Sequence, residues 1–236
     1  MLDKSEFQNN ETDHIVSIIK STVGIIPFAG PLLSEIVGNI IPNQRIDRLT
    51  EYIKILDKNI SKIPKETIIA LKNNPDFIDL IEEGFVQASR AKSDNRRKYI
   101  ASIITNGISE KSIQLIESKY LLKILEELND AEIIWLRYYY DSTRMNENNF
   151  YNEHRNILSP VSVSKVSGKE SHNKASIQSS YKEHLERLQL IKYHIQIDKK
   201  SGIAEFNRQT GKPKVTRKSI THLGILILEQ MGLIEE

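Results

Sequence analysis

The sequence predicts a mainly α-helical protein, with an N-terminal multi-helix domain followed by a small α+β domain. Apolar residues recur at steps of three and four in most segments between residues 13 and 140, which is the spacing of an amphipathic helix. Proline, glycine and asparagine punctuate these segments, as they do at helix ends. After residue 190, apolar and polar residues alternate, which is typical of strands.

Composition restricts the class of protein. The chain has 236 residues, of which 39% are apolar and 27% charged, and this suits one large domain or two small ones. It contains no cysteine, which excludes disulfides, thiolate catalysis and cysteine-based zinc sites. The first 14 residues are polar and include acids, unlike a secretory signal or a transit peptide. We therefore expect a cytoplasmic protein.

The pattern divides the chain into four regions. Residues 1–12 are expected to be a mobile N-terminus, and residues 13–140 a helical domain with an apolar helical hairpin at 15–41. Residues 141–171 are polar and are either a flexible insert or linker, or contain small elements. Residues 172–236 are expected to form the α+β domain.

The apolar hairpin is the least charged part of the chain, since Val23 to Ile41 contains a single formal charge. Pro27 and Pro31 interrupt it, which predicts two short helices. Each arm has about 10 to 12 residues, whereas a membrane-spanning helix needs roughly 20. The hairpin is therefore either buried core or a contact for a partner or for the inner membrane surface. The residues predicted for that contact are Ile25, Ile26, Phe28, Leu32, Leu33 and Ile36.

The next helices follow from apolar periodicity and from breakers. Three helices are expected over residues 45–63, 67–72 and 112–128. Between the last two of these, Asp76 is expected to cap a further helix. Another is expected to begin at Ser93 or Asp94 and to end at Asn106-Gly107. Asp130 is expected to cap a helix over 131–140. That helix is apolar nearly all round, which predicts a place at the centre of the N-terminal domain. Its aromatic run, Trp135 and Tyr138 to Tyr140, is expected to be core.

The C-terminal region predicts a helix, a hairpin and a closing helix. Ile177, Tyr181, Leu185 and Leu188 form a helical stripe, and Tyr193, Ile195 and Ile197 alternate as in a strand. Lys199 to Gly202 has turn chemistry. Segments 203–206 and 214–216 are expected to return as strands, and 220–231 to form the last helix.

Positive charge is concentrated in this hairpin. Between Lys199 and Lys218 there are seven basic residues and one acidic one, in a chain whose net charge is only +2. Clustered cations of this kind suit phosphate contacts, with the exposed side of the preceding helix left to read bases. The candidate nucleic-acid or anion contacts are Lys174, Gln178, Ser179, Lys182, Lys199, Lys200, Arg208, Lys212 and Lys214. The alternatives are a solvated charged hairpin and an acidic protein partner, and Glu183 and Glu186 would repel phosphate.

No other motif predicts chemistry. The six histidines lack metal-ligand spacing, and neither a glycine-rich phosphate loop nor a GxSxG motif occurs. We therefore predict no catalytic residue, metal or cofactor. Arg96, Arg97 and Lys98 would stand at the positive end of a helix beginning near Asp94, and would then need carboxylates or an anion nearby.

Two resemblances extend these expectations. Three segments resemble the C-terminal part of a winged-helix domain: Ser179 to Tyr181, His184 to Ile191 and Thr221 to Leu228. This resemblance implies a recognition helix followed by a wing. The chain also resembles uncharacterised bacterial proteins that include the abortive-infection alpha family, which is linked with phage resistance. The similar segments are Ile41 to Leu49, Arg96 to Ala101 and Glu127 to Ile133. That resemblance implies no catalytic residue.

Three functions remain open, of which the weakest is an enzyme whose site is assembled only in the fold. The leading hypothesis is a non-enzymatic bacterial interaction or effector module in phage defence, acting through protein contact and through membrane contact by the apolar hairpin. The alternative is a DNA-binding regulator that uses the C-terminal winged helix. Association of identical chains is compatible with either.

Overall fold

The computed structural model describes residues 46–109, 114–144, 149–161, 163, 166–208 and 211–235. The predictions for the N-terminal 12 residues and for the apolar hairpin at 15–41 lie outside these residues. The described chain is mainly helical, with one two-stranded antiparallel sheet near its C-terminal end. It divides into two compact units, the first comprising residues up to Glu127 together with Gln230–Glu235, and the second Leu128–Glu229.

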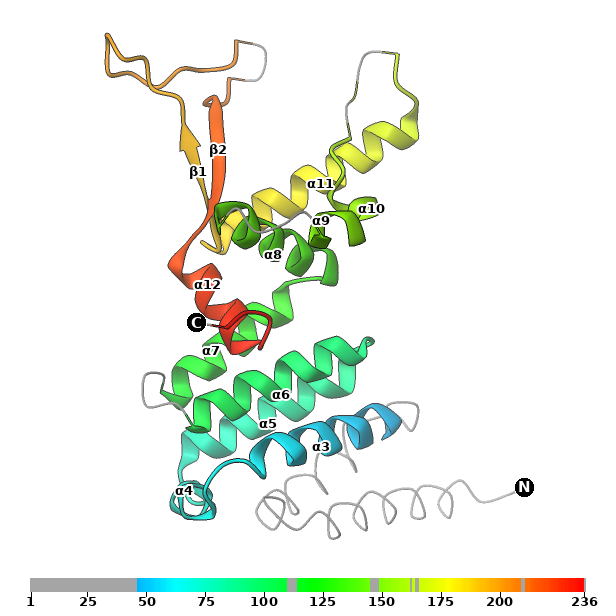
Figure 1. Cartoon of the computed structure of the whole chain (residues 1–236), viewed down its shortest axis with the longest axis vertical. Coiled ribbons are helices and arrows are strands. Elements are labelled where there is room, and N and C mark those ends of the chain that lie inside the picture. The colour runs from blue at the N-terminus through cyan, green and yellow to red at the C-terminus, as the bar shows by residue number, and fades with distance from the viewer. Residues whose placement is uncertain are drawn as a thin grey trace, which may run out of the picture. The chain divides into compact units, whose positions relative to one another are not determined.

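The first unit is a bundle built from amphipathic helices (Figure 1). Its helices are α3 (Ile46–Ile60), α4 (Lys65–Leu71), α5 (Pro75–Arg90), α6 (Asp94–Ser109) and α7 (Leu115–Glu127). Helices α3, α5 and α6 pack against one another, α7 packs on α5 and α6, and α4 contacts α6. The predicted apolar stripes point inward, and the fully buried side chains include Leu49, Tyr52, Ile53, Leu80, Phe85, Ile100 and Ile104.

Two helix boundaries in this unit differ from the prediction. Asn74, not Asp76, caps α5, since its Oδ1 accepts hydrogen bonds from the backbone N–H of Asp76 (2.8 Å) and Phe77 (3.4 Å). Pro75 then occupies the first helical turn, where its missing N–H costs nothing. Asn106-Gly107 does not end α6, which continues to Ser109. Gly107 serves instead as a close-packing position, because an added Cβ would lie 2.1 Å from Ser118 Oγ on α7.

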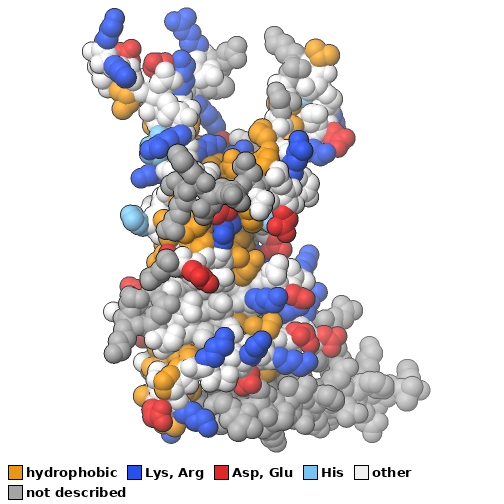
Figure 2. Space-filling model, viewed as in Figure 1, with side chains coloured by type: hydrophobic (Ala, Val, Ile, Leu, Met, Phe, Trp, Pro, Cys, Tyr) orange, Lys and Arg blue, Asp and Glu red, His pale blue; other side chains and the backbone are white. Residues whose placement is uncertain are grey.

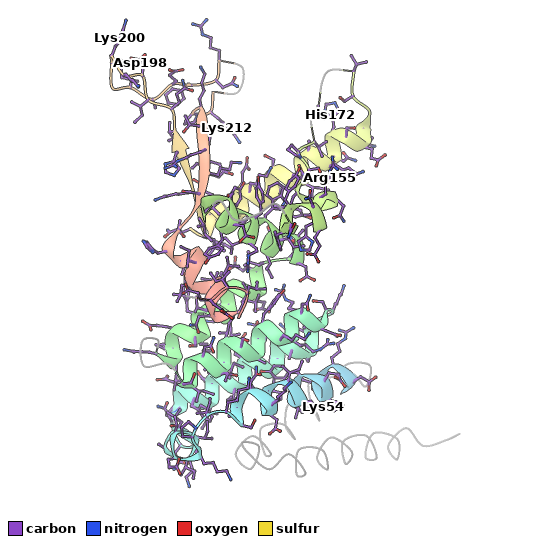
Figure 3. The ribbon with its side chains drawn as sticks, viewed as in Figure 1. Lys54, Arg155, His172, Asp198, Lys200 and Lys212 are labelled. Carbon is purple, nitrogen blue, oxygen red and sulfur yellow. The ribbon has the colours of Figure 1, made fainter. Side chains whose placement is uncertain are left out.

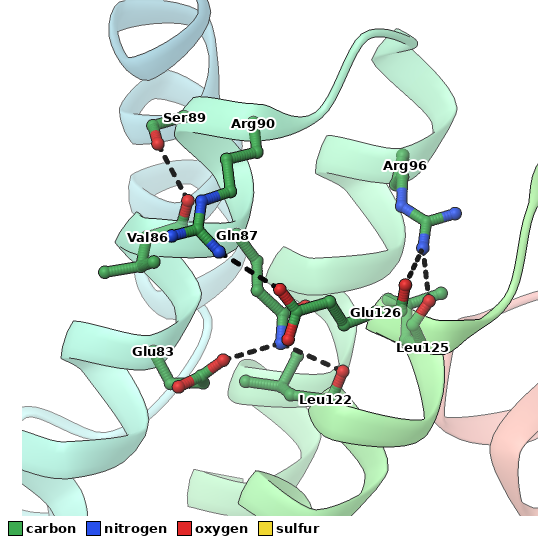
Figure 4. Close-up of polar contacts among 9 residues, drawn as sticks. All are labelled: Glu83, Val86, Gln87, Ser89, Arg90, Arg96, Leu122, Leu125 and Glu126. Carbon is green, nitrogen blue, oxygen red and sulfur yellow. Dashed lines mark hydrogen bonds and ion pairs between the residues drawn. The ribbon is translucent and has the colours of Figure 1, made fainter. Parts of the chain in front are cut away.

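The arginines at the start of α6 bind the carboxyl ends of neighbouring helices, and Figure 4 shows the contact of Arg96 with the end of α7. Helix α6 begins at Asp94, as predicted, and Ser93 Oγ accepts from the N–H of Arg96 (3.3 Å). The guanidinium of Arg96 donates to the carbonyl of Leu125 at the end of α7. Arg97 is buried, donates to the carbonyl of Ala91 (3.0 Å) and pairs with Asp94. Carbonyl oxygens therefore provide most of the negative partners that these cations require.

The second unit contains the remaining elements, in chain order (Figure 1). They are α8 (Asp130–Arg144), α9 (Asn149–Glu153), α10 (Arg155–Leu158), α11 (Lys169–Arg187), β1 (Ile191–Ile195), β2 (Val215–Ile220) and α12 (His222–Gln230). Residues 141–171 therefore contain the end of α8, two short helices and the start of α11.

Helix α8 groups with the second unit, although the sequence placed it at the centre of the N-terminal domain. It packs on α11, β2 and α10. Trp135, Tyr139 and Tyr140 are buried, which confirms that the aromatic run belongs to a core. The rings of Trp135, Tyr138 and Tyr139 lie within 6.0 Å of one another, centroid to centroid. A helix that is apolar on several faces needs several neighbours, and α11 and the sheet supply them here.

A reciprocal capping box begins α8. Asn129 Oδ1 accepts from the N–H of Glu132 (2.9 Å), and Glu132 Oε2 accepts from the N–H of Asn129 (2.9 Å). Asn129 is therefore the cap that the sequence assigned to Asp130. The second carboxylate oxygen of the buried Glu132 lies 2.7 Å from His184 Nδ1, which ties α11 to the start of α8.

The sheet joins α12 through a tight junction. Ile220, predicted to begin the last helix, is the final residue of β2, and Thr221 Oγ1 accepts from the N–H of Gly224 (3.1 Å) as the cap of α12. The hydroxyl of Thr221 also bonds the carbonyls of Gln189 (2.6 Å) and Leu190 (3.1 Å). This junction fixes where the root of the hairpin lies.

Candidate functional site

The candidate site is a forked hairpin within residues 191–220, of which the structure describes 191–208 and 211–220 (Figure 1). At its root, β1 pairs antiparallel with β2, with Ile191 opposite Ile220 and Tyr193 opposite Lys218. Beyond β1 the chain makes two short hairpins, marked by the isolated bridges Ile197–Ala204 and Phe206–Pro213. The predicted strand at 203–206 is therefore reduced to two bridges.

Backbone hydrogen bonds fix the point where the hairpin divides. The N–H of Gln196 donates to the carbonyl of Lys214 (2.8 Å), and the N–H of Lys214 donates to the carbonyl of Glu205 (2.8 Å). The N–H of Glu205 in turn donates to the carbonyl of Gln196 (2.9 Å). Three stretches of chain thus meet there in extended pairing. Two tips extend beyond this point, the first at residues 198–202 and the second with its described residues at 207–208 and 211–212.

An Asx turn shapes the first tip. Asp198 Oδ1 accepts from the N–H groups of Lys200 (2.9 Å) and Ser201 (2.7 Å) and from Ser201 Oγ (3.0 Å). The two hydrogen bonds from Ser201 have the largest effect on the pKa of Asp198, followed by the bond from Lys200, and all three lower it. Gly202 has φ +67°, which an L side chain rarely adopts. The turn leaves Lys199 and Lys200 exposed at the end of the tip, where Figure 3 labels Asp198 and Lys200.

The second tip carries Arg208 and Lys212. The N–H of Asn207 donates to the carbonyl of Lys212 (2.9 Å), and the N–H of Gly211, at φ +65°, donates to Asn207 (2.8 Å). Arg208 and Lys212 are both exposed. Figure 2 shows lysine and arginine side chains over the forked hairpin.

The predicted cations differ in whether they have acidic partners. Lys212 pairs with Glu183 of α11 (3.2 Å), and Lys214 pairs with Glu205 (2.8 Å). For Lys199, Lys200 and Arg208, no carboxylate lies within ion-pair distance in the described part of the chain, and these three cations therefore remain available to an external anion.

The outward face of the sheet adds two cations and a histidine that were not predicted for the site from the sequence. Lys192, His194 and Arg217 share this face, and His194 Nε2 lies 2.8 Å from Ser219 Oγ. Desolvation, followed by the positive charges of Arg217 and Lys192, lowers the pKa of His194. Strand alternation in the sequence could have identified the face, because these residues lie at every second position of each strand.

The four residues predicted to read bases lie on two different faces of α11. Lys174 and Ser179 are exposed, and Lys174 pairs with Glu170 (2.8 Å). Gln178 Nε2 instead donates to the carbonyls of Ile157 and Ser159, both at 2.9 Å, which holds α11 against α10. Lys182 is turned towards α8. Only half of the predicted reading surface therefore faces solvent.

Lys182 and Lys218 lie over aromatic rings at the root of the hairpin. Lys182 Nζ is 4.1 Å from the ring centroid of Trp135, and Lys218 Nζ is 4.5 Å from that of Tyr193, its cross-strand partner. Both lysines are part-buried. Desolvation lowers the pKa of each, and the charge of Lys182 lowers that of Lys218 further.

The forked hairpin also exposes apolar side chains among its cations. Ile203 is 65% exposed and Phe206 53%. The other exposed apolar residues of the hairpin are Ile195, Ile197 and Val215.

Comparisons with protein-family models, with curated proteins and with solved structures find no match to this chain. Within the described ranges, no helix combines the length and apolar content that crossing a bilayer requires. In the same residues, no three His, Asp or Glu side chains are grouped as metal ligands would be.

Proposed function

We propose that this chain is a binding module whose forked hairpin contacts the phosphate backbone of nucleic acid. The observation that carries the proposal is the set of three exposed cations at the two tips, Lys199, Lys200 and Arg208, without carboxylate partners in the described chain. The whole hairpin holds eight basic and two acidic residues. Neutralising phosphates with such cations releases counterions, which drives binding.

The contact would position the protein on a backbone more than it would read sequence. On α11, the exposed acids Glu183 and Glu186 lie near the residues expected to read bases, and Gln178 and Lys182 are already engaged. Phosphate contacts give affinity, and base-edge contacts give specificity. We therefore expect the protein to discriminate only weakly between different nucleic-acid sequences.

We extend the proposal to a winged-helix-like arrangement of the second unit. The order of α11, a β-hairpin and α12 supports it, because a recognition helix followed by a wing has this order. In this arrangement the forked hairpin is the wing, and it carries most of the contact.

Neutralising the two tips tests the proposal. The variant Lys199→Gln, Lys200→Gln, Arg208→Gln should bind a 20-base-pair duplex at least about tenfold more weakly than the unaltered protein in low salt. Fluorescence anisotropy of a labelled duplex measures this difference.

The matched control removes the same charge elsewhere. Lys58, Lys62 and Lys65 are exposed residues of the first unit, and their change to Gln should alter affinity less than about twofold. Equal weakening by the two triple variants would show that only net charge matters. Absence of binding to duplex and to single strands at low salt would remove the proposal.

The exposed apolar residues favour a second candidate, the phage-defence effector that acts through protein contact. Ile203 and Phe206 would then form the contact, because burying them against a partner removes apolar surface from water. The double variant Ile203→Ser, Phe206→Ser should abolish protection of expressing cells in a plaque assay, whereas the tip variant should retain it. The reverse result would favour nucleic acid. Membrane contact through residues 15–41 stays a prediction, since that segment lies outside the described residues.

A further inference from the structure

The forked hairpin has one apolar and one polar face at the point where it divides. Three extended stretches meet there, 195–197, 204–206 and 213–215, and their outer residues pair as Ile195–Val215, Ile197–Ala204 and Phe206–Pro213. Side chains alternate between the two faces of extended chain, and directly opposite residues share a face. The six paired residues therefore lie on one face, and the three central residues, Gln196, Glu205 and Lys214, lie on the other.

Side-chain contacts on the polar face agree with this division. Gln196 Nε2 donates to Glu205 Oε1 (3.1 Å), and Lys214 Nζ pairs with Glu205 Oε2 (2.8 Å). The polar groups of the three central residues thus satisfy one another on one side of the backbone. The other side is apolar, and its six residues are Ile195, Ile197, Ala204, Phe206, Pro213 and Val215.

This apolar face is covered at the root of the hairpin and open beyond it. Ile191 is buried where β1 and β2 pack on α11 and α8. Farther along the same face of β1, Ile195 is 45% exposed and Ile197 59%, and Phe206 is similarly exposed. Single exposed apolar residues are ordinary, whereas a contiguous patch rimmed by polar residues is typical of an interaction surface.

Positive charge borders the apolar face on two sides. The first tip, with Lys199 and Lys200, connects Ile197 to Ala204, and the second tip, with Arg208, connects Phe206 to Pro213. A ligand that matches this surface offers apolar groups and negative charges at short intervals. A single strand of nucleic acid does so at every nucleotide, because each unpaired base presents a ring face beside a phosphate. In a duplex the ring faces are stacked on one another and are not available.

We propose that the apolar face of the forked hairpin binds the unpaired bases of a single-stranded nucleic acid, with the ring of Phe206 stacking on a base. The phosphate contacts rest on the proposed function, to which this inference adds a preference for single strands. Every base has a ring face, so stacking tolerates any sequence, in agreement with the weak discrimination expected above.

Comparing two ligands tests the preference. The full chain is titrated with a labelled 20-base oligothymidylate and with a 20-base-pair duplex, and fluorescence anisotropy gives both affinities. Charge alone favours the duplex, because its phosphates are more densely spaced. At physiological ionic strength we expect the single strand to bind at least about fivefold more tightly, because salt screens the phosphate contacts but not the stacking.

Substitutions on the apolar face test the role of the ring. Phe206→Leu keeps an apolar side chain but removes the ring, and should weaken single-strand binding at least about fivefold and duplex binding less than about twofold. Phe206→Tyr keeps the ring and should retain the preference. Ile197→Ser, in another stretch of the same face, should also weaken single-strand binding. The matched control is Tyr120→Leu, which removes a ring that is 57% exposed on α7 and should change neither affinity.

The results separate this inference from the proposed function. The tip variant Lys199→Gln, Lys200→Gln, Arg208→Gln should weaken binding of both ligands, whereas Phe206→Leu should weaken only that of the single strand. Absence of binding to either ligand removes both proposals. Duplex binding that depends on the tips, without a preference for the single strand, overturns this inference alone. An unchanged ratio of affinities in Phe206→Leu also overturns it, and leaves the apolar face to a protein partner.

Discussion

At the scale of single residues, adjacent side chains of the same type perform different tasks. Arg96 binds the carboxyl end of α7, whereas Arg97 is buried and binds the carbonyl of Ala91 just beyond α5. The sequence places both at the start of a helix, where the helix dipole disfavours cations. It does not show that the ends of two other helices lie opposite, since that depends on tertiary packing.

Arg97 should therefore matter for stability far more than its neighbour Lys98. Replacing Arg97 with Met leaves the carbonyl of Ala91 without its donor and removes the pair with Asp94. We expect the free energy of unfolding to fall by about 1 to 3 kcal/mol. Lys98 is exposed, and Lys98→Met should change the free energy by less than about 0.5 kcal/mol. Urea denaturation of both variants measures the difference, and equal losses would contradict the assignment.

His194 predicts a pH dependence of nucleic-acid binding. Its pKa lies below the ordinary 6.5, because of desolvation and the neighbouring Arg217 and Lys192. The side chain is therefore neutral at pH 7, and gains a positive charge as the pH falls through its lowered pKa. Duplex affinity should increase as the pH is lowered from 7.5 to 5.5, at fixed ionic strength and beyond any change shown by His194→Gln.

Folding stability changes in the opposite direction from affinity, because the unfolded chain binds the proton of His194 at a higher pH than the folded chain does. The contribution of His194 to the free energy of unfolding is fully present above pH 6.5 and is lost as the pH falls below that value. An affinity profile that is identical in the unaltered protein and in His194→Gln would contradict the role of this side chain.

At the scale of elements, the position of the forked hairpin depends on close packing between α12 and the loop before β1. Gly224 in α12 lies so near this loop that an added Cβ would be 2.2 Å from the carbonyl oxygen of Leu190. Alanine normally favours a helix over glycine by about 1 kcal/mol. Here the steric contact with backbone outweighs that preference.

Gly224→Ala should lower the free energy of unfolding by about 1 to 3 kcal/mol, because the loop and α12 must separate to admit the methyl group. Gly168 is the control, since it has a negative φ and nothing within 4 Å of the Cβ position. Gly168 is the N-cap of α11, where glycine is preferred over alanine, so Gly168→Ala should lower the free energy of unfolding by less than about 1 kcal/mol. Thermal melts of both variants test the contrast, and a stabilised Gly224→Ala would refute the close contact.

Several elements could be predicted from the sequence because their signals are local. The apolar stripe of α3 predicts that helix to within a few residues, and the alternation from Ile191 predicts β1. Non-local contacts explain the differences. Gly107 resembles a helix stop until Ser118 is seen against it, and Gln178 looks available until the carbonyls of Ile157 and Ser159 appear. The contacts of Lys182 with Trp135 and of Lys218 with Tyr193 involve four elements, α11, α8, β2 and β1, which no single sequence pattern reveals.

At the scale of the whole molecule, charge is unevenly distributed. The net charge is +2, and the forked hairpin alone carries eight basic residues against two acidic ones, so the rest of the chain is net negative. A polyanion should therefore bind through the hairpin and be repelled elsewhere. This contrast depends on ionic strength, because salt screens the repulsion and removes the gain from counterion release.

The most direct test of this account is the salt dependence of duplex binding by the full chain. The logarithm of the association constant is measured against the logarithm of salt concentration for the unaltered protein and for Lys199→Gln, Lys200→Gln, Arg208→Gln. Each phosphate contact contributes about 0.9 to the slope, so the variant should be shallower by about 2 to 3. Identical slopes would contradict the claim that the tips of the forked hairpin contact the nucleic-acid backbone.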